Sequence, residues 1–243
     1  MNRSETTSSI SKMARFSGVL YLFIAVCGGF AFFAGYENLL VTGDSAATAN
    51  NIINSEAIFR LGFAGDALTF LSEIILTILL YHLFKPVGKT LSQIAALARL
   101  AMTAMIGMNL LNKLIVLHLL NNADYAAVFT AEQLEALMNL FMTAYGFGSL
   151  IWGVFFGLHL LVIGYLIFNS SYFPKILGVL FAFASFGYFT DSFGTFLLPQ
   201  FEAFYTVIIL ATIPAELTFA FWLLIKGINV KQWQKHVLVP SQA

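Results

Sequence analysis

Long apolar stretches alternate with short polar breaks along almost the whole chain. The hydrocarbon core of a bilayer is about 30 Å thick, and a helix crosses it with roughly 20 apolar residues. Six stretches meet this requirement, and the breaks between them carry proline, lysine or asparagine, as in Lys85-Pro86-Val87-Gly88-Lys89. The pattern predicts transmembrane helices near residues 16–36, 58–84, 91–120, 140–168, 174–198 and 203–227.

Two connecting segments are expected to form helices outside the membrane. Asp44 precedes the short run 45–54 and is a favoured N-cap residue. Thr130-Ala131-Glu132-Gln133 fits a capping box, in which the Thr and Gln side chains bond each other's backbone N–H groups. A helix from there to residue 168 is about 57 Å long, so we expect its first part to run along the outer membrane face.

Composition places the surface of the predicted helices against lipid. Hydrophobic residues make up 59% of the chain and charged residues only 10%, whereas a soluble domain carries about 25% charge. The formal net charge of zero provides no basic face, so we exclude nucleic acid as a partner. We therefore predict an all-α integral membrane bundle of one domain, residues 1–243, whose main partner is the lipid bilayer.

The signs of the loop charges predict the orientation of the helices, because cytoplasmic loops carry excess lysine and arginine. With a cytoplasmic N-terminus, the inner basic residues are Arg3, Lys12, Arg15, Lys85, Lys89, Lys175, Lys226, Lys231 and Lys235. The outer acidic residues are then Glu37, Asp44, Glu56, Asp124, Glu132, Glu135 and Glu202, with Arg60 beside them. We expect both termini in the cytoplasm and the first apolar run to be a retained helix, since no cleavage motif follows it.

Polar side chains lie inside five of the predicted spans. Burial of an ionised group in the bilayer costs on the order of several kcal/mol of free energy, so each ionisable residue there is a candidate for a functional role or for pairing. The candidates for ligand or ion binding are Asp66, Glu73, Asn109, Asn112, Lys113, His159, Asp191 and Glu216. We count four acids here and one base. One lysine cannot pair with all four acids, so some are expected to be protonated, hydrated or bound to a cation. The pattern predicts a polar cavity that opens outward.

Lys113 is expected to share a hydrogen bond with Asp66 or Asp191, which lie at a similar depth by residue count. Such a pair has two readings: it forms part of a ligand site, or it only neutralises one acid. Asn109 and Asn112 share a helix face with Lys113 and are either site residues or interhelical hydrogen-bonding groups.

Glycines form a stripe on the fourth predicted helix. Gly146, Gly153, Gly157 and Gly164 share one face, and the Gly153-Val-Phe-Phe-Gly157 motif is typical of closely packed membrane helices. His159 lies on another face, where it either reaches the cavity or bonds a neighbouring helix.

No enzyme motif is present: we find no H-E-x-x-H, G-x-S-x-G or Walker loop. A single cysteine, Cys27, excludes an intrachain disulfide and a cysteine-based zinc site. The spacing of the intramembrane acids and His159 gives no specific support for a metal, so we predict no metal and no cofactor. Whether the protein is an enzyme stays open.

Several stretches carry a resemblance that covers residues 14–229. They are Phe59-Arg60-Leu61-Gly62-Phe63-Ala64-Gly65-Asp66, Gly157-Leu158-His159, Gly164-Tyr165-Leu166, Phe173-Pro174-Lys175-Ile176-Leu177-Gly178-Val179-Leu180, Gly187-Tyr188-Phe189-Thr190-Asp191-Ser192-Phe193, Ala215-Glu216-Leu217 and Trp222-Leu223-Leu224-Ile225-Lys226-Gly227. They resemble the bacterial DUF4386 family of uncharacterised multi-pass membrane proteins. The resemblance implies a protein of the bacterial cytoplasmic (inner) membrane, and its pattern includes Asp66, His159, Asp191 and Glu216. It implies no reaction.

Three functions are compatible with this sequence. The favoured one is binding or transport of a small or amphipathic molecule, a cation or a proton through the outward-facing cavity. The second is an intramembrane, metal-assisted enzyme that acts on lipid, and the third is an accessory membrane subunit. The oligomeric state stays open.

The predicted orientation is tested with single cysteines in a Cys27→Ser background. Cysteines at Ser45 and Ala127 should react with a membrane-impermeant thiol reagent in intact cells, because both positions lie outside. A cysteine at Ser170 should be protected. Labelling of Ser170 together with protection of Ser45 would reverse the orientation.

Overall fold

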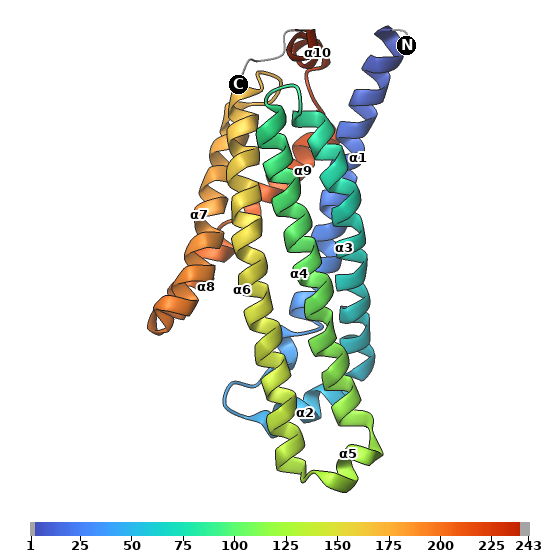
Figure 1. Ribbon diagram of the computed structural model, residues 1–243, viewed down its shortest axis with the longest axis vertical. Helices are drawn as coiled ribbons and strands as arrows, with labels where there is room; N and C mark the ends of the chain where they lie inside the picture. The colour runs from blue at the N-terminus through green and yellow to red at the C-terminus, as the bar shows by residue number, and fades with distance from the viewer. Residues whose placement is uncertain (1–2, 239–243) are drawn as a thin grey trace. The chain divides into compact units, whose positions relative to one another are not determined.

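The computed structural model describes residues 3–238, with the side chains of all of these except 3–7, 202, 203 and 206. Arg3 and Glu202, both used for the orientation, therefore lie outside the described side chains. The helices are α1 (Arg3–Phe33), α2 (Ser45–Asn54), α3 (Glu56–Phe84), α4 (Lys89–Asn121), α5 (Ala123–Val128), α6 (Ala131–Asn169), α7 (Lys175–Leu197), α8 (Glu202–Leu210), α9 (Ile213–Ile225) and α10 (Val230–Leu238), with short 3₁₀ turns at Glu37–Leu39 and Pro199–Phe201 (Figure 1).

The prediction of an all-α membrane bundle is confirmed. Over residues 3–238 the regular structure is helical, and six helices are long and apolar enough to cross a membrane. The last of these candidate spans runs from Val207 to Ile225 and includes a break. The protein thus has the number of spans that its sequence predicts.

The chain divides into two compact units. Unit 1 comprises Met1–Phe23, Ser72–Thr103 and Leu150–Ala243, and unit 2 comprises Ile24–Leu71 and Ala104–Ser149. The long helices α1, α3, α4 and α6 each contribute one part to either unit.

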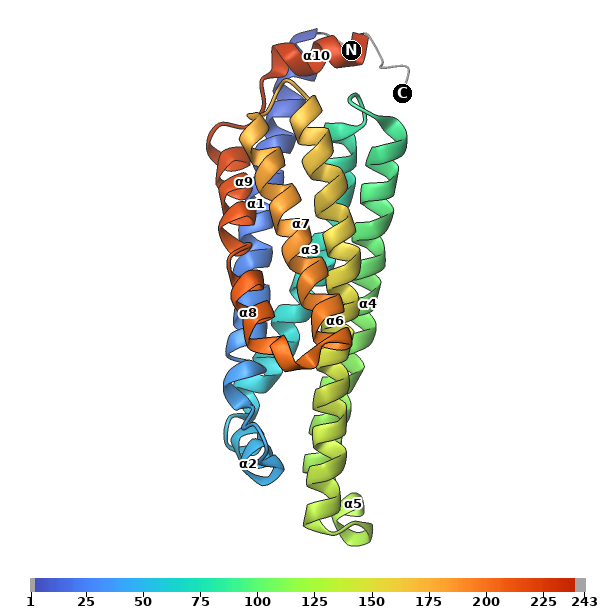
Figure 2. The same ribbon diagram turned by 90° about the vertical axis from the view of Figure 1, so that its left-hand side faces the viewer.

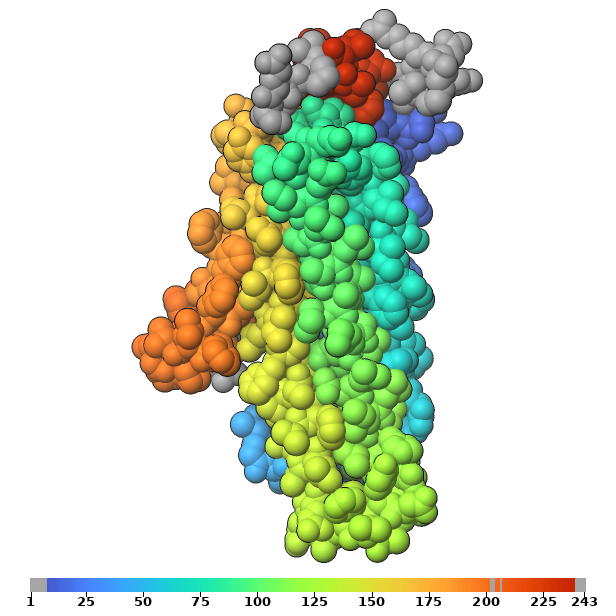
Figure 3. Space-filling view, in the orientation of Figure 1, coloured from blue at the N-terminus to red at the C-terminus, as the bar shows by residue number. Residues whose placement is uncertain are grey.

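Unit 1 holds α7, α8, α9 and α10 together with its parts of the long helices. α7 packs along both α8 and α9 (Figure 2). Part of α7, orange in Figure 3, lies at the surface of this unit, where Phe186 and Phe196 are 64% and 77% exposed. Exposed phenylalanine of this kind is the surface expected to face lipid rather than water.

Three glycines of the predicted stripe confirm its role in helix packing. Gly153 and Gly157 lie against Ser192 and Phe189 of α7. Further along, Gly164 meets Gly178 of α7 so closely that a Cβ on either would touch the other's carbonyl oxygen. Small residues allow this backbone approach, which is how membrane helices gain contact area.

The last predicted helix, 203–227, is wrong as one continuous element. It is interrupted at residues 211–212, where Thr212 N–H bonds Ile209 O at 3.0 Å and Ala215 N–H bonds Thr212 O at 3.0 Å. Both hydrogen bonds join residues that are three apart, whereas those of an α-helix join residues that are four apart. Pro214 explains the change, because it has no N–H for the Leu210 carbonyl and its ring disfavours a helical residue before it.

An additional helix, α10, follows the last span and has no counterpart in the prediction. Trp233 Nε1 and Tyr172 OH both donate to Leu83 O at the end of α3, at 3.0 and 2.7 Å. Burial raises the pKa of Tyr172, so its hydroxyl keeps the proton that this bond requires. α10 and the beginning of α1 lie at the same end of unit 1, near the basic 85–89 and 170–175 connections (Figure 1).

Unit 2 confirms the two predicted helix starts. Asp44 Oδ1 accepts from Ala47 N–H at 2.8 Å and caps α2. At the start of α6, Gln133 N–H bonds Thr130 Oγ1 at 3.3 Å, and Thr130 N–H bonds Gln133 Oε1 at 2.9 Å, which is the expected capping box. α6 then continues to Asn169 with no break near residue 140, where we had expected the span to begin.

The apolar core of unit 2 joins residues from α2 and from its parts of α3, α4 and α6. Its fully buried members are Ile52, Phe59, Val116 and Met138, and the Tyr36 and Tyr145 rings lie at its polar edge with centroids 4.7 Å apart. The Tyr36 hydroxyl also donates to Met142 O at 3.3 Å.

A single methyl group tests the α6–α7 contact. We expect Gly178→Ala to lower the free energy of unfolding by roughly 1–3 kcal/mol, because the new Cβ meets backbone that cannot yield. Gly107→Ala is the matched control, since its Cβ would meet nothing within 4 Å on α4. Both are read as thermal unfolding midpoints in detergent. Equal midpoints for Gly178→Ala and wild type would show that the helices do not approach this closely.

Candidate functional site

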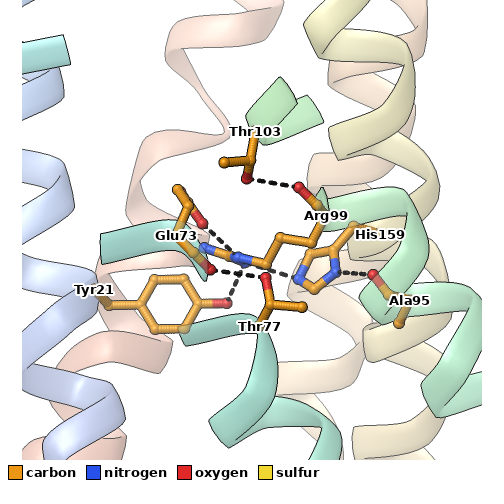
Figure 4. A network of polar contacts seen from close by, with 7 residues as sticks. All are labelled: Tyr21, Glu73, Thr77, Ala95, Arg99, Thr103 and His159. Atoms are coloured by element: carbon orange, nitrogen blue, oxygen red, sulfur yellow. Dashed lines mark hydrogen bonds and ion pairs between the residues drawn. The ribbon is translucent and has the colours of Figure 1, made fainter. Parts of the chain in front are cut away.

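A buried salt bridge joins α3 and α4 in unit 1. Glu73 Oε2 lies 2.5 Å from Arg99 Nε, and the two residues are 3% and 1% exposed (Figure 4). The Thr77 hydroxyl donates to the backbone oxygen of Glu73 at 2.7 Å. The Thr103 hydroxyl donates to the backbone oxygen of Arg99 at 2.8 Å. A charge pair with so little solvent needs further polar contacts to its charged groups, because neither ion is stable there alone.

The rest of the Arg99 guanidinium contacts α1 and α6. Nη1 donates to Tyr21 OH at 3.2 Å and to His159 Nε2 at 2.8 Å (Figure 4). The guanidinium also lies over the rings of Tyr21 and Phe156, at 5.0 and 5.8 Å from their centroids. Aromatic faces attract a desolvated cation, so these rings take the place of water around Arg99.

The contacts of His159 define its protonation pattern. Arginine has donors only, so His159 Nε2 must accept the Arg99 bond. The other ring nitrogen, Nδ1, lies 2.9 Å from Ala95 O, and a carbonyl can only accept, so Nδ1 carries the hydrogen. His159 is therefore a neutral imidazole with both nitrogens in use, and it corresponds to the reading in which it bonds neighbouring helices.

Glu216 lies in the first turn of α9, directly after the break. Its Oε1 accepts a hydrogen bond from Tyr188 OH of α7 at 2.8 Å. Tyr188 itself packs against Phe156 and Trp152 of α6, with ring centroids 4.8 and 5.7 Å apart. Within residues 3–238, Glu216 forms no salt bridge, and it is only partly buried.

In unit 2, Lys113 pairs with Asp66, which confirms the expected ion pair. Lys113 Nζ lies 2.7 Å from Asp66 Oδ2 and 4.5 Å from the centroid of the Tyr145 ring, and Lys113 is fully buried. Tyr145 OH donates to the same Asp66 oxygen at 3.1 Å. The bridge joins α3 to α4, and Tyr145 adds α6.

The two asparagines extend this cluster. Asn109 Nδ2 donates to Tyr145 O of α6 at 2.8 Å, and Asn112 Nδ2 donates to Asn109 Oδ1 at 2.9 Å. Gly148 of α6 leaves the space that the Asn109 amide fills. Asn109 thus corresponds to the reading of an interhelical hydrogen-bonding group, whereas Asn112 bonds Asn109 from the same helix.

The structure sorts the four predicted acids between the units. Asp66 belongs to unit 2, and Glu73, Asp191 and Glu216 belong to unit 1. Asp191 lies on α7, three residues after Tyr188, and is partly buried. A cavity of about 270 Å³ beside His236 in unit 1 and one of about 400 Å³ beside Arg60 in unit 2 are lined by other residues. A cavity shared by the acids stays a prediction.

Sequence reasoning missed Arg99, so its count of a single intramembrane base is wrong. The signal was available: Arg99 and Lys113 are fourteen residues apart on α4 and therefore share a face. Asp66 and Glu73, seven apart on α3, share the facing side. Antiparallel neighbours with acids on one face and bases on the other predict two salt bridges. The tyrosines that bond these groups carry no comparable signal.

Metal chemistry receives no support from the side-chain positions. Among the residues that the structure describes, no three His, Cys, Asp or Glu side chains come together in a group that could hold a metal ion. His159 has no nitrogen lone pair left for a ligand, as shown above.

Six apolar helices with charge pairs buried between them define a multi-pass α-helical membrane protein. The chain belongs to the DUF4386 family: the family model, described as a domain of unknown function, matches residues 16–227. The chain is also similar to an uncharacterized protein of the archaeon Archaeoglobus fulgidus, with 32% identity over 168 residues that cover 67% of this chain and 82% of the relative. No solved structure matches the chain.

The Asp66–Lys113 pair can be tested by removing one charge and then both. Lys113→Met should lower the free energy of unfolding by roughly 3–5 kcal/mol, because it leaves a buried carboxylate without its counterion. Adding Asp66→Asn should recover part of this loss. As a matched control, Arg60→Met breaks the exposed Glu56–Arg60 pair and should cost less than about 1 kcal/mol. Additive losses in the Lys113→Met, Asp66→Asn double variant would contradict the pairing.

Proposed function

We propose that this protein binds and moves a proton or small cation across the membrane, with Glu216 as the binding carboxyl. The observation that carries the proposal is that the intramembrane acids differ in the partners of their carboxyl groups. Glu73 and Asp66 each have a basic partner, whereas Glu216 has only the Tyr188 hydroxyl within the described part of the chain.

A carboxyl without a basic partner is the group best suited to exchange a positive charge. An ionised carboxylate inside a bilayer costs several kcal/mol or so, and the cost is removed when it takes up a proton or a cation. The paired acids cannot do this as readily, because release of their basic partner would leave a buried cation uncompensated. Glu73 and Asp66 thus serve the structure, and Glu216 remains for exchange.

The helix break beside Glu216 supports the same function. Discontinuous membrane helices form ion sites in many transporters, because backbone groups at the break are free to bond a ligand. Here the break at 211–212 separates α8 from α9, and Pro214 removes the N–H that would otherwise occupy the Leu210 carbonyl. Glu216 follows within the first turn of α9.

Two further aspects of the proposal follow from the fold. An all-helical bundle is the architecture of cytoplasmic membranes, whereas outer membranes use β-barrels, so we place the protein in a cytoplasmic (inner) membrane.

A metal-assisted lipid hydrolase would need a metal ligand such as His159, whose two ring nitrogens are both engaged in hydrogen bonds. Binding and transport therefore remain the better supported function. A proton or small cation is favoured over a lipid or another small molecule as the ligand, because a carboxyl without a basic partner attracts positive charge.

The test uses purified protein in liposomes that contain a pH-sensitive dye. An inward proton gradient with a potassium diffusion potential should drive proton uptake in wild type, and replacement of protons by sodium or an organic cation extends the assay. Glu216→Gln should abolish uptake while keeping the thermal unfolding midpoint close to wild type, since the amide matches the acid in shape. Glu56→Gln is the control and should leave uptake unchanged, because Glu56 is an acid with a basic partner at the start of α3. Full uptake by Glu216→Gln would exclude the proposal.

A further inference from the structure

Four buried polar groups in unit 1 have no hydrogen-bond partner in the structure. Ser92 Oγ lies in the first turn of α4, and the other three lie on α6 and α7. Trp152 Nε1, Ser185 Oγ and Ser192 Oγ are inaccessible, and the structure provides no hydrogen-bond partner for any of them. Ser185 and Ser192 are 0% and 4% exposed as whole residues. A buried polar atom without a partner costs roughly 1–3 kcal/mol, so an ordered water is the usual explanation.

The two serines differ from ordinary serines in membrane helices. A helical serine normally donates to the carbonyl four residues earlier, as Ser17 does to Met13 O at 2.9 Å. Ser185 and Ser192 make no such bond. Their hydroxyls are therefore free to bond a molecule that lies beside α7.

The three unpartnered groups on α6 and α7 lie near Tyr188. Ser185, Tyr188 and Ser192 share one face of α7, because they are three and four residues apart. Gly153 of α6 lacks the side chain that would otherwise strike the Ser192 hydroxyl. Trp152, next to Gly153, packs its ring on Tyr188 with centroids 5.7 Å apart. The free donors thus surround the residue that bonds Glu216.

Hydrogen-bonding capacity also remains on the other side of Glu216. The Tyr188 bond uses Oε1 of Glu216, and a carboxylate has a second oxygen, Oε2, that can accept a hydrogen bond from a water. Tyr21 OH accepts from Arg99, but no described residue accepts the Tyr21 hydroxyl hydrogen. The Tyr21 ring packs against Phe219 of α9, which lies one turn after Glu216, with centroids 5.7 Å apart.

We infer that ordered waters link Ser192 and Trp152 to Tyr188 and Glu216 and continue to Tyr21, and that this path carries protons. The inference rests on the proposed function and narrows its ligand to the proton. It lies wholly within unit 1. The groups that are too buried for bulk water but unsatisfied by protein are the ones that a chain of internal waters would bond.

Each step of this path exchanges one O–H bond for another. Glu216 Oε2 takes a proton from a neighbouring water, and that water regains one from the next water toward Ser192. On release, Oε2 gives its proton to a water on the Tyr21 side. Tyr188 keeps its hydrogen bond to Oε1 throughout and positions the carboxyl.

The path is tested by the initial rate of proton uptake in the liposome assay. Ser192→Ala and Trp152→Phe should each slow uptake several-fold, because each removes a group that holds a water. Ser17→Ala is the matched control: it also removes a fully buried helical hydroxyl, but one that bonds its own helix. It should leave the rate unchanged.

The outcomes separate the path from the function. Wild-type rates in Ser192→Ala and Trp152→Phe, with Glu216→Gln inactive, would overturn the water path and leave the proposed function standing. Uptake of sodium without protons would do the same. Activity in Glu216→Gln would overturn both. If a variant does not fold, cryo-electron microscopy of the wild type decides: density for water at Ser192 Oγ and Trp152 Nε1 supports the path, and bare contacts there exclude it.

Discussion

The guanidinium of Arg99 is the group on which the arrangement of unit 1 depends. It bonds Glu73 of α3 and both Tyr21 of α1 and His159 of α6, so one side chain of α4 ties three other helices to it. A charge in this position is tolerated only because every contact compensates for lost water. Loss of any partner would leave a buried charge without a hydrogen bond, which is costly in free energy. We therefore expect the four helix segments to keep one relative placement within the unit.

Unit 2 uses the same principle with different residues. Asp66 and Lys113 form the pair, and Tyr145 bonds the acid and covers the base. Both pairs place the acid on α3 and the base on α4, which selects these two helices as neighbours and sets their register. In contrast, the hydrogen bond that the described part of the chain gives to the Glu216 carboxyl comes from the Tyr188 hydroxyl. This difference supports the proposed role of Glu216 in exchange.

Features set by local sequence could be predicted, and those set by tertiary contact could not. The six spans follow from hydrophobic length, and the caps at Asp44 and Thr130 follow from side-chain chemistry next to a helix start. Arg99 could have been found from its spacing to Lys113. The break at 211–212 was only hinted at by Pro214, since proline in a membrane helix can also bend it without interruption. The tyrosine that meets Glu216 comes from another helix, and periodicity does not identify such partners.

The charges of unit 1 are held by direct hydrogen bonds, in which His159 is a neutral acceptor for Arg99. Nitrogen-15 NMR of the imidazole, with His159 assigned by comparison with a His159→Gln variant, measures this directly in bilayers. We predict one protonated nitrogen, Nδ1, and one unprotonated nitrogen, Nε2, that is shifted by its bond to the guanidinium. Two protonated nitrogens on His159, or a proton on Nε2 alone, would contradict the account.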